Sequence, residues 1–537
     1  MATGTPAGAG LVQIAGPVPL VDWLVVVPLA LPLLAAGVCL MLRSRNDLQA
    51  PIAIGALALL VLNNLALLAR VAADGPLVMT MGNWLPPFGI TFAVDLLSAV
   101  LLLSASAAGL AGAVASLADI GEAYRRHGYF SFFLLLVAGV SGSFATGDIF
   151  NLYVWFEVFL IASFGLIVLG GEARQLDGAV KYGVLNFLAT TLFLIAIAYL
   201  YGLVGTLNMA DIPQAVARLE ASAPIATVTA LFVLAFAMKA AAFPVHAWLP
   251  ASYHTPRIVV AAIFGGLLTK VGVYALLRIV VMLVAVPFAG FQPAMAWIAG
   301  LTALFGALAA LAERDVRRVL GFVVISGIGV MLVGIAVGGE QGLSGTIVYV
   351  VHSMFATTAI YLTVGAMERA VGGRDLAAGA GIFRDRALLA GLFLVFAFAL
   401  AGLPPFSGVW PKVILIEASL AAGNPWLAAV VVVSGFLTTV ALARIWILVV
   451  LRNPRAAPAA GEGLAAAGLA AATASGGASG RAGGRAETAS TAALVALAVV
   501  VVGLGLFPAP LIDAASDGAA TLVDPSGYAR SVLGGPQ

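Results

Sequence analysis

Long apolar stretches separated by short polar segments fill most of this chain. Most of these stretches reach roughly 20 residues, the length that an α-helix needs to cross the hydrocarbon core of a bilayer. The pattern predicts fourteen membrane-spanning helices, near residues 20–42, 51–70, 90–117, 129–147, 149–170, 179–205, 225–249, 258–285, 293–312, 319–338, 345–367, 387–421, 427–451 and 491–508. We therefore expect an all-α polytopic membrane protein.

Two of the predicted helices contain prolines that should break them. The stretch 225–249 carries Pro244, and the stretch 387–421, which is too long for one straight helix, carries Pro404, Pro405 and Pro411. Proline removes a backbone N–H and so interrupts the helical hydrogen bonds. Irregular backbone at membrane depth is tolerated inside protein or beside a cavity, and broken helices commonly mark transport sites. The alternative is a kink that serves packing alone.

Composition narrows the class of protein. Hydrophobic residues make up 62% of the 537 residues and charged residues only 9%, against about 25% charged in soluble domains. A soluble enzyme, a disordered protein and a secreted disulfide scaffold are therefore excluded. The single cysteine, Cys39, excludes internal disulfides and cysteine-ligated clusters, and four histidines without a carboxylate cluster make a metal site unexpected. The net charge of +2 makes nucleic acid an unexpected partner.

Basic residues indicate how the chain is oriented. Of the 26 Lys and Arg residues, 18 fall in or beside loops that follow odd-numbered spans and three fall on the other side. The positive-inside rule then places the odd loops in the cytoplasm and both termini outside. The low-complexity stretch 456–490 is expected to be a flexible cytoplasmic loop. Neither that stretch nor Met1–Gly16 is expected to carry chemistry.

Three of the four lysines interrupt apolar stretches, whereas the other 22 basic residues are all arginines. A charged group at mid-bilayer costs about 2.5–3.5 kcal/mol on insertion scales. Lysine can lose its proton when it is buried, whereas arginine effectively cannot. Lys239, Lys270 and Lys412 therefore suggest a proton path, in preference to lysines that merely extend to the membrane surface.

Two of these lysines lie next to the predicted breaks. Pro244 should leave the carbonyl of Ala240 without a helical partner, close enough to Lys239 to solvate its ammonium group. Pro411 can begin a new half-helix with Lys412 in its first turn, where the positive end of the helix dipole disfavours the charged lysine. For both residues, a break that serves packing only is the alternative.

Lys270 and Glu157 complete the set of intramembrane charges. Lys270 lies among small residues that leave room for close helix contact or for water, and it could relay protons between the other two lysines. Glu157 is the clearest carboxylate inside a predicted helix. A nearby carboxylate favours a charged lysine, so a Glu–Lys pair that opens and closes could load and release a proton. The sequence leaves open which lysine meets Glu157 and whether the pair is inert.

Histidines offer further groups that titrate near neutral pH. His246 and His254 flank the break after Pro244, where they suit proton uptake, and His352 lies in the stretch 345–367 near Ser353. Structural, hydrogen-bonded histidines are the alternative for all three. Four further charged residues in or near predicted helices are assigned no role: Asp95, Arg278, Arg444 and Glu417.

Several long strings of residues resemble a known family. They cover residues 148–210, 243–250, 265–278 and 402–408, and the likeness extends over about residues 90–450. The chain resembles the antiporter-like subunits that respiratory complex I shares with multisubunit cation/proton antiporters. Within that superfamily the strings favour the D-type subunits of the Mrp-type sodium/proton antiporters.

The resemblance implies a fold and a division of the chain. The family has fourteen helices, with two inverted five-helix repeats and discontinuous helices 7 and 12. The first three helices would then occupy residues 1–128, the repeats 129–285 and 293–451, a cytoplasmic loop 452–490, and helix 14 with a tail 491–537.

The resemblance also implies roles for residues. Carried over by motif, the family's proton-path residues are Glu157 in helix 5, Lys239 in helix 7, Lys270 in helix 8, His352 in helix 11 and Lys412 in helix 12. With His246 they form the predicted proton-translocating set. This chain departs from many relatives in carrying Ser353, Met354 and Thr357 where a further polar residue and a lysine follow the histidine. The link between Lys270 and Lys412 is therefore expected to depend on His352 and water.

The predicted function is a proton-translocating subunit of a multisubunit antiporter that exchanges Na⁺ or another monovalent cation for protons across the cell membrane. The expected partners are other subunits of an Mrp complex, and no cofactor is expected. The alternative is a pumping subunit of a complex I-type or membrane-hydrogenase redox complex, driven by chemistry elsewhere. This chain has no dinucleotide fingerprint of its own. A structural scaffold would not explain three intramembrane lysines.

Overall fold

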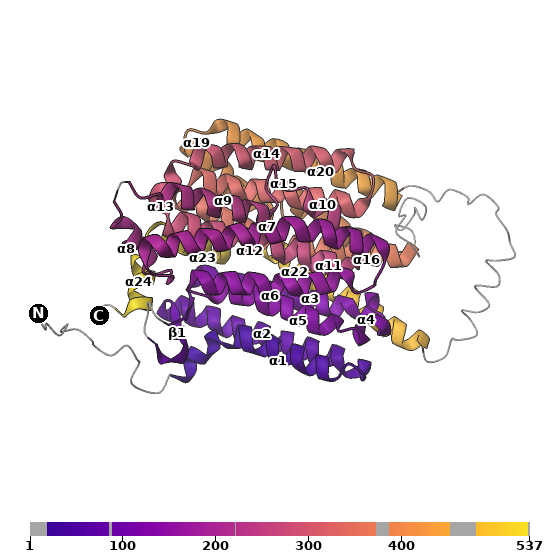
Figure 1. Ribbon diagram of the computed structural model, residues 1–537. Coiled ribbons are helices and arrows are strands. Elements are labelled where there is room, and N and C mark those ends of the chain that lie inside the picture. The colour runs from indigo at the N-terminus through magenta and orange to yellow at the C-terminus, as the bar shows by residue number, and fades with distance from the viewer. Residues whose placement is uncertain (1–18, 85–88, 221, 372–385, 452–478, 535–537) are drawn as a thin grey trace, which may run out of the picture.

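A bundle of long helices with nearly aligned axes makes up the protein (Figure 1). The computed structural model describes residues 19–84, 89–220, 222–371, 386–451 and 479–534. Within these residues, ten helical segments are long and apolar enough to cross a membrane. They are α2 (Asn46–Asp74), α3 (Leu96–Asp119), α6 (Ile149–Val168), α7 (Ala173–Val204), the continuous run α11–η3–α12–η4 (Ile258–Leu283), α14 (Gln292–Ala312), α15 (Val316–Val337), α16 (Gly339–Val371), α20 (Pro425–Ile445) with η5 (Trp446–Leu451), and α22 (Ser479–Leu506).

Shorter elements complete the bundle. Four are apolar helices: α1 (Val27–Met41), α5 (Tyr129–Ala145), α9 (Ile225–Ala240) and α18 (Ala387–Ala401). The others are η1 (Leu20–Val25), β1 (Leu77–Thr80), η2 (Met81–Asn83), β2 (Thr91–Val94), α4 (Glu122–Arg126), α8 (Ile212–Ala217), α10 (Trp248–Ser252), α13 (Ala285–Ala289), α19 (Val409–Ala421), α23 (Ala509–Val523) and α24 (Ser526–Leu533). The predicted class, a polytopic helical membrane protein, is confirmed. The number of fourteen spans stays a prediction.

Local signals explain where several helices begin. The side chains of Asp95, Asp148 and Asp315 each accept a hydrogen bond from a backbone N–H in the first turn of α3, α6 and α15 respectively. Such N-cap bonds satisfy donors that the helix itself leaves unpaired. The middle stretches of the helices carry apolar residues on most faces. This is expected of segments that contact lipid on one face and protein on the other.

The structure differs from the sequence prediction at three places. Residues 91–94, predicted as helix, form β2, which pairs antiparallel with β1, because β-branched residues precede the helix start that Asp95 caps. The predicted loop ending at residue 490 is helical from Ser479, in keeping with its alanine content. Residues beyond the last predicted span form α23 and α24. Residues 1–16 and 456–478, predicted to carry no chemistry, lie outside the described residues.

Two long segments occupy the middle of the bundle. All residues in the most apolar windows of Ile258–Leu283 and α16 are buried, whereas most residues in those of α2, α7 and α22 are not. The two central segments pack against each other through α11, η3 and α16. Their position matters because they carry Lys270 and His352, which are therefore remote from the lipid-facing surface.

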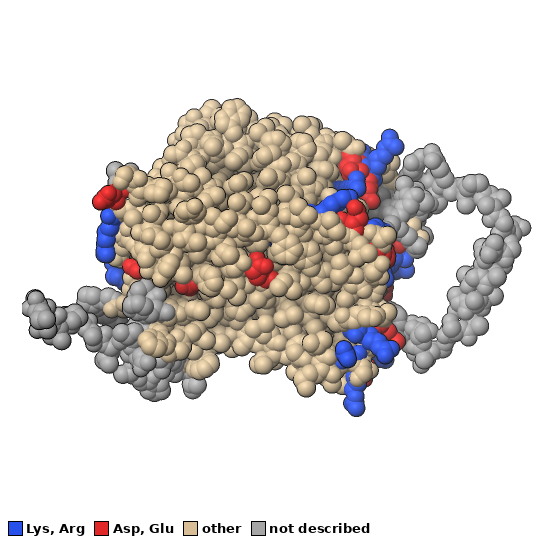
Figure 2. Space-filling model, viewed as in Figure 1, with Lys and Arg blue, Asp and Glu red and all other residues tan. Residues whose placement is uncertain are grey.

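Charged residues lie mostly at the two ends of the bundle. Figure 2 shows a broad, largely uncharged belt with a few small acidic patches, and Lys and Arg residues gathered chiefly beyond it, most densely at the right-hand end. That end carries α4 and the loop side of α16 in Figure 1. At the opposite end, β1 contacts both η1 and α24, so the first and last described elements both lie against this strand. The belt fits a membrane-spanning body with two water-facing ends.

Candidate functional site

The first break follows α9. The helix ends at Ala240, and Ala241 takes the left-handed conformation with φ 62°. The N–H of Ala242 then bonds back to the carbonyl of Ala237 at 2.8 Å, the pattern of a Schellman helix end. The chain passes a cis bond at Pro244 and resumes as α10. The break predicted from this proline is present.

Lys239 lies in the last turn of α9 and is only 5% exposed. Its Nζ has no hydrogen-bond partner among the described residues and lies 5.7 Å and 5.9 Å from the ring centres of Phe156 and Phe159 on α6. Glu157, half-buried on the same helix, interacts electrostatically with Lys239. The sequence left open which lysine meets Glu157, and the structure places Lys239 beside it.

One carbonyl at the end of α9 accepts a hydrogen bond from a side chain beyond the break. The indole N–H of Trp248 on α10 donates to the carbonyl of Met238 at 3.0 Å. The expected contact between Lys239 and the carbonyl of Ala240 is not formed, since the Nζ of Lys239 has no hydrogen-bond partner among the described residues. Lys239 is left with aromatic rings and a carboxylate as its neighbours.

The second break follows α18 and has the same backbone pattern. Gly402 takes the left-handed conformation with φ 84°, and the N–H of Leu403 bonds to the carbonyl of Phe398 at 3.0 Å. A cis bond joins Pro404 to Pro405, and α19 starts at Val409. The two predicted breaks are thus built alike.

Lys412 lies in the first turn of α19, as the sequence predicts. The predicted start of this half-helix at Pro411 is wrong: the helix starts two residues earlier, at Val409, and its first turn tolerates the proline. The Nζ of Lys412 crosses the break and donates to the carbonyls of Ala401 at 2.5 Å and Leu400 at 3.2 Å. Those carbonyls close the C-terminal end of α18, where a cation is favoured. Lys412 therefore joins the two halves of the broken helix.

Lys270 occupies the centre of the bundle. It follows a π-helical turn, Phe264–Leu268, and its buried Nζ donates to the carbonyl of Gly265 at 2.5 Å. Single π-turns inside α-helices frequently occur at functional sites. No acidic side chain among the described residues forms an ion pair with Lys270. Among the described residues, Lys270 therefore has a backbone carbonyl and no carboxylate as its hydrogen-bond partner.

His352 connects the central helix to the second break. Its Nδ1 lies 2.8 Å from the hydroxyl of Ser407, which belongs to the break between α18 and α19. Its Nε2 is buried and has no partner among the described residues. The imidazole interacts electrostatically with both Lys412 and Lys270. His352 is thus linked to the second break by Ser407 and interacts electrostatically with both lysines, and its role between them stays a prediction.

His246 lies in the first break and is surrounded by aromatic rings. Its ring centre is 5.6 Å from that of Phe243 and 4.6 Å from that of Phe305 on α14. Its Nδ1 has no hydrogen-bond partner in the described part of the chain. His254, beyond α10, has Nδ1 2.9 Å from the carbonyl of Pro250. His246 is therefore buried in the break itself, whereas His254 is held by a local contact.

The candidate residues form two groups that meet at one helix contact. Glu157 and Lys239 make one group, and Lys270, His352 and Lys412 make the other. The helix of the first group, α9, packs against the helix of Lys270, α12. At this contact Gly272 lies directly against Ala240. Glycine permits this approach because a side chain there would overlap the backbone of α9. No group of three His, Cys, Asp or Glu residues in the described chain could hold a metal ion.

Sequence reasoning missed two buried ion pairs. Arg278 donates to Asp95 at 2.7 Å and to the hydroxyl of Ser98 at 3.1 Å, beneath the ring of Tyr528 on α24. Asp95, assigned no role from the sequence, is 2% exposed. The available signal was an arginine inside an apolar stretch, which requires a buried partner. The pair ties α24 to the bundle core.

The second missed pair joins α15 to α16. Arg317 donates through Nε to Glu368 at 2.7 Å, makes a second bond to the same carboxylate, and donates through Nη1 to the carbonyl of Pro256 at 2.8 Å. Its side chain is 7% exposed. From the sequence, Arg317 is only one of the 18 basic residues in or beside the loops that follow odd-numbered spans. Nothing in its local pattern shows that the end of α16 returns to meet it.

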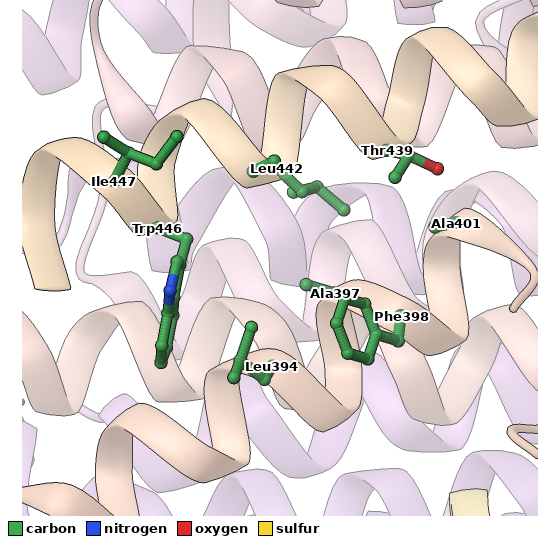
Figure 3. A pocket seen from close by; sticks show the side chains of 9 residues that line it. Leu394, Ala397, Phe398, Ala401, Thr439, Leu442, Trp446 and Ile447 are labelled. Carbon is green, nitrogen blue, oxygen red and sulfur yellow. The ribbon is translucent and has the colours of Figure 1, made fainter. Parts of the chain in front are cut away.

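An apolar pocket of about 350 Å³ lies between α18 and α20 near the second break (Figure 3). In Figure 3, Leu394 and Leu442 approach it from facing helices, with Trp446 at one end and Ala401 at the other. Ala401 connects the pocket to the break, since its carbonyl accepts a hydrogen bond from Lys412. Among the described residues, no charged side chain lines the pocket. It is therefore not part of the row of titratable groups.

The fold and this row of buried lysines define the class: a polytopic membrane protein with the architecture of the antiporter-like subunits. Residues 146–438 match the family described as NADH:quinone oxidoreductase/Mrp antiporter, TM. The chain is 37% identical to the D-type subunit of the Na⁺/H⁺ antiporter of Alkalihalophilus pseudofirmus, over 79% of this chain and 86% of that protein. The chain belongs to this family of D-type Na⁺/H⁺ antiporter subunits.

Solved structures agree with this assignment. A chain in the structure of the Mrp complex from Dietzia sp. DQ12-45-1b superimposes with a TM-score of 0.85 at 32% identity, covering 96% of this chain and 100% of that chain. A chain of respiratory complex I from Thermus thermophilus superimposes with a TM-score of 0.77 at 24% identity, covering 94% and 100%. The second likeness shows the shared fold. These relatives are subunits of larger complexes.

Proposed function

We propose that this chain is the proton-translocating subunit of a multisubunit antiporter that exchanges Na⁺ or another monovalent cation for protons. The observation that carries the proposal is the buried row of Lys239, Lys270, His352 and Lys412, with Glu157 beside its first lysine. Structure alone rarely requires three lysines at this depth, since each costs a few kcal/mol to bury. The named relatives are antiporter subunits, which supports cation/proton exchange as the coupled process.

Glu157 and Lys239 suit the loading step. The carboxylate favours the charged form of Lys239, and the ammonium group has no hydrogen bond that fixes it in place. If Glu157 turns to another cation, Lys239 loses that support and releases its own proton toward Lys270. Glu157 is partly exposed and can respond to groups outside this chain.

His352 suits transfer in the second group. Its Nδ1 is engaged by Ser407, so its Nε2 is the atom left to exchange a proton. Lys270 and Lys412 both act on it electrostatically. A neutral imidazole can therefore accept a proton from one lysine and return one to the other. Lys412, held by carbonyls across the break, receives the charge at the far end of the row.

His246 is proposed as an auxiliary group of the first break. Its imidazole is buried among rings, near Lys239 in sequence but on the far side of the left-handed turn. In this position it can exchange protons only with water or groups that reach the break.

For the orientation, we propose that the arginine-rich end of the bundle faces the cytoplasm. The segregation of basic residues supports this, with both termini on the opposite, outer side of the plasma membrane. The partners are other subunits of an Mrp-type complex, together with protons, monovalent cations and the surrounding lipid. The alternative, a pumping subunit of a redox complex, is less well supported because the complex I likeness is 24% identical.

Transport by everted vesicles that contain the assembled complex tests the proposal. Lys239→Ala and Glu157→Ala should each abolish Na⁺-dependent proton movement while the complex still co-purifies. The matched control is Lys181→Ala, because Lys181 lies exposed on α7 in a surface pair with Asp177. Full exchange by Lys239→Ala, or equal loss in Lys181→Ala, would refute the assigned roles. Co-purification of iron–sulfur or flavin subunits in place of antiporter subunits would favour the alternative.

A further inference from the structure

An apolar crevice of about 470 Å³ opens between α2, α3 and α22 and reaches the central helix α16 at Phe355. Every described side chain that lines it is apolar. Ala492 and Ala496 of α22 belong to the lining and are exposed, so the crevice opens onto the surface of the bundle. We call it the α22 crevice. It is separate from the row of titratable groups, since none of them lines it.

The helices beside the α22 crevice face the hydrocarbon part of the membrane. Most residues in the most apolar windows of α2 and α22 are not buried inside the protein. An apolar cavity offers water no hydrogen-bond partner and therefore stays free of water. An occupant must be apolar and come from the membrane or from another chain, and the dimensions of the crevice distinguish these two sources.

The α22 crevice is long and narrow. Its lining on α22 extends from Ala489 to Val500, which corresponds to about 16 Å along the helix axis. An α-helix is about 10–12 Å across with its side chains, so a stretch of that length would displace on the order of 1,000 Å³ or more. That is more than twice the volume of the crevice. A hydrocarbon tail is one carbon chain wide, so the dimensions favour a lipid tail over a helix of a partner subunit.

An arginine lies beside the end of the α22 crevice that is nearer the arginine-rich end of the bundle. Arg369 and Phe355 are nearly four turns apart on α16, so their side chains leave similar faces of that helix about 21 Å from each other. The Nη2 of Arg369 donates to the hydroxyl of Ser490 at 3.3 Å, and Ser490 directly follows Ala489 of the lining. A lipid tail in the crevice would therefore have its head group near Arg369.

Arg369 has donors left for a head group. Of its guanidinium nitrogens, only Nη2 donates a hydrogen bond to a described residue. The carboxylate of Glu487 lies 3.5 Å from Nε without a hydrogen bond to it, and the side chain of Arg369 is 21% exposed. A guanidinium group binds phosphate through paired N–H donors. A narrow apolar crevice with such a group at one end matches the two chemical parts of a phospholipid.

We propose that the α22 crevice holds one phospholipid, with a tail along α22 that reaches Phe355 and the phosphate at Arg369. The inference goes beyond the proposed function, because the lipid takes no part in proton transfer. Phe355 lies three residues after His352 on α16. The tail therefore packs against the helix that carries a member of the titratable row.

A photoreactive phosphatidylglycerol, with a diazirine in the middle of one tail, tests the occupant. The whole complex is placed in phosphatidylcholine vesicles that contain a small fraction of this lipid, and the labelled residues are mapped by mass spectrometry after irradiation. We expect label on Phe355 and on the α22 residues that line the crevice. A complex without label at these residues, as when a partner subunit covers them, would overturn the proposal.

Ala496→Phe tests the crevice itself, because the ring fills the space from an exposed position. The label on Phe355 should be lost while the complex still co-purifies. Val499→Phe is the matched control, since Val499 is 66% exposed on the same helix and does not line the crevice. If both variants or neither of them lose the label, the lipid contacts α22 without occupying the crevice, and the proposal is wrong.

Arg369→Gln tests the phosphate contact, with a photoreactive diacylglycerol of the same tails as the reference lipid without phosphate. The ratio of phosphatidylglycerol label to diacylglycerol label should fall about fivefold, the factor expected for one arginine near the membrane surface. Arg369→Lys should keep most of the ratio, and Arg386→Gln, an exposed arginine outside the lining, should leave it unchanged. Equal ratios in the wild type and Arg369→Gln would refute the phosphate contact. Lys239→Ala should be labelled like the wild type, so failure of the proposed function is distinguishable from failure of the lipid site.

Discussion

The two helix breaks share a backbone pattern but place their lysines on opposite sides of it. In both, a left-handed residue ends the helix and the next N–H bonds back to the carbonyl five residues earlier. Lys239 precedes its break, whereas Lys412 follows the other. The exposed helix end is then capped by different groups: Trp248 in the first break and Lys412 in the second.

The two lysines accordingly have different neighbours. The indole of Trp248 donates to Met238 at the end of α9, and Lys239 has no hydrogen bond among the described residues but interacts electrostatically with Glu157. Lys412 is itself the donor and holds α18 to α19. With the same backbone pattern, Lys239 is thus left without a hydrogen bond among the described residues, whereas Lys412 links the two half-helices. Four variants can break or sharpen this comparison.

The largest effect is expected from Lys239→Arg. Arginine keeps the positive charge beside Glu157 but does not release a proton at physiological pH. Exchange should fall by about a hundredfold or more, the contribution typical of an acid–base group. The measurement is the initial rate of Na⁺-driven proton movement, with co-purification as the check on assembly. Exchange close to the wild-type rate would mean that Lys239 supplies charge only.

The next largest effect is expected from Gly402→Ala. Alanine in the left-handed conformation costs about 1–2 kcal/mol, and its Cβ would lie 2.6 Å from Cδ of Lys412. The side chain of Lys412 must therefore move off the carbonyls that it caps. We expect a lower melting temperature of the purified complex and slower exchange. An unchanged melting temperature would show that the contact between the half-helices is not needed.

A smaller effect is expected from Trp248→Phe. This variant removes the indole N–H and leaves the carbonyl of Met238 with the backbone N–H of Ala241 as its remaining donor; the loss of one hydrogen bond typically costs about 0.5–1.5 kcal/mol. Lys239 is the nearest cation on that helix end and can take over the cap, as Lys412 does in the second break. Thermal unfolding should show modest destabilisation, and exchange should slow because Lys239 becomes fixed. Faster exchange would argue against this competition.

The smallest effect is expected from Ala241→Gly. Glycine relieves a left-handed alanine, a gain of about 1 kcal/mol, but it also increases the entropy of the unfolded chain by about 0.4–1 kcal/mol. The two terms nearly cancel. The melting temperature and exchange rate should both stay close to the wild type. Together with Gly402→Ala, this variant separates backbone strain from the contact with Lys412.

The sequence was sufficient for features that depend on local patterns. Apolar length predicted the helices, and proline positions predicted the breaks at Pro244 and Pro404. The first-turn position of Lys412 also followed from the chain alone. The resemblance to antiporter-like subunits supplied the grouping of Lys270 with His352. The fold class and the two breaks are present because each one depends only on neighbouring residues, whereas the roles of Lys270, His352 and Lys412 stay predictions.

Features that depend on distant partners could not be predicted. The cap from Trp248 to Met238 requires the path of the chain through the break, so the sequence suggested a carbonyl contact for Lys239 that is not formed. The pair of Asp95 with Arg278 joins residues far apart in the chain. A single sequence shows that a buried arginine needs a partner but not which residue supplies it.

The central claim is that Lys239 becomes neutral during the transport cycle. The chain contains only four lysines, so ¹⁵N labelling of lysine side chains, compared between wild type and Lys239→Arg, can identify the signal of Lys239 in vesicles. We predict that, while a Na⁺ gradient drives proton movement across the vesicle membrane, part of the Lys239 signal shifts to that of the neutral amine. A Lys239 signal that stays fully charged while the same vesicles exchange Na⁺ for protons would contradict the claim.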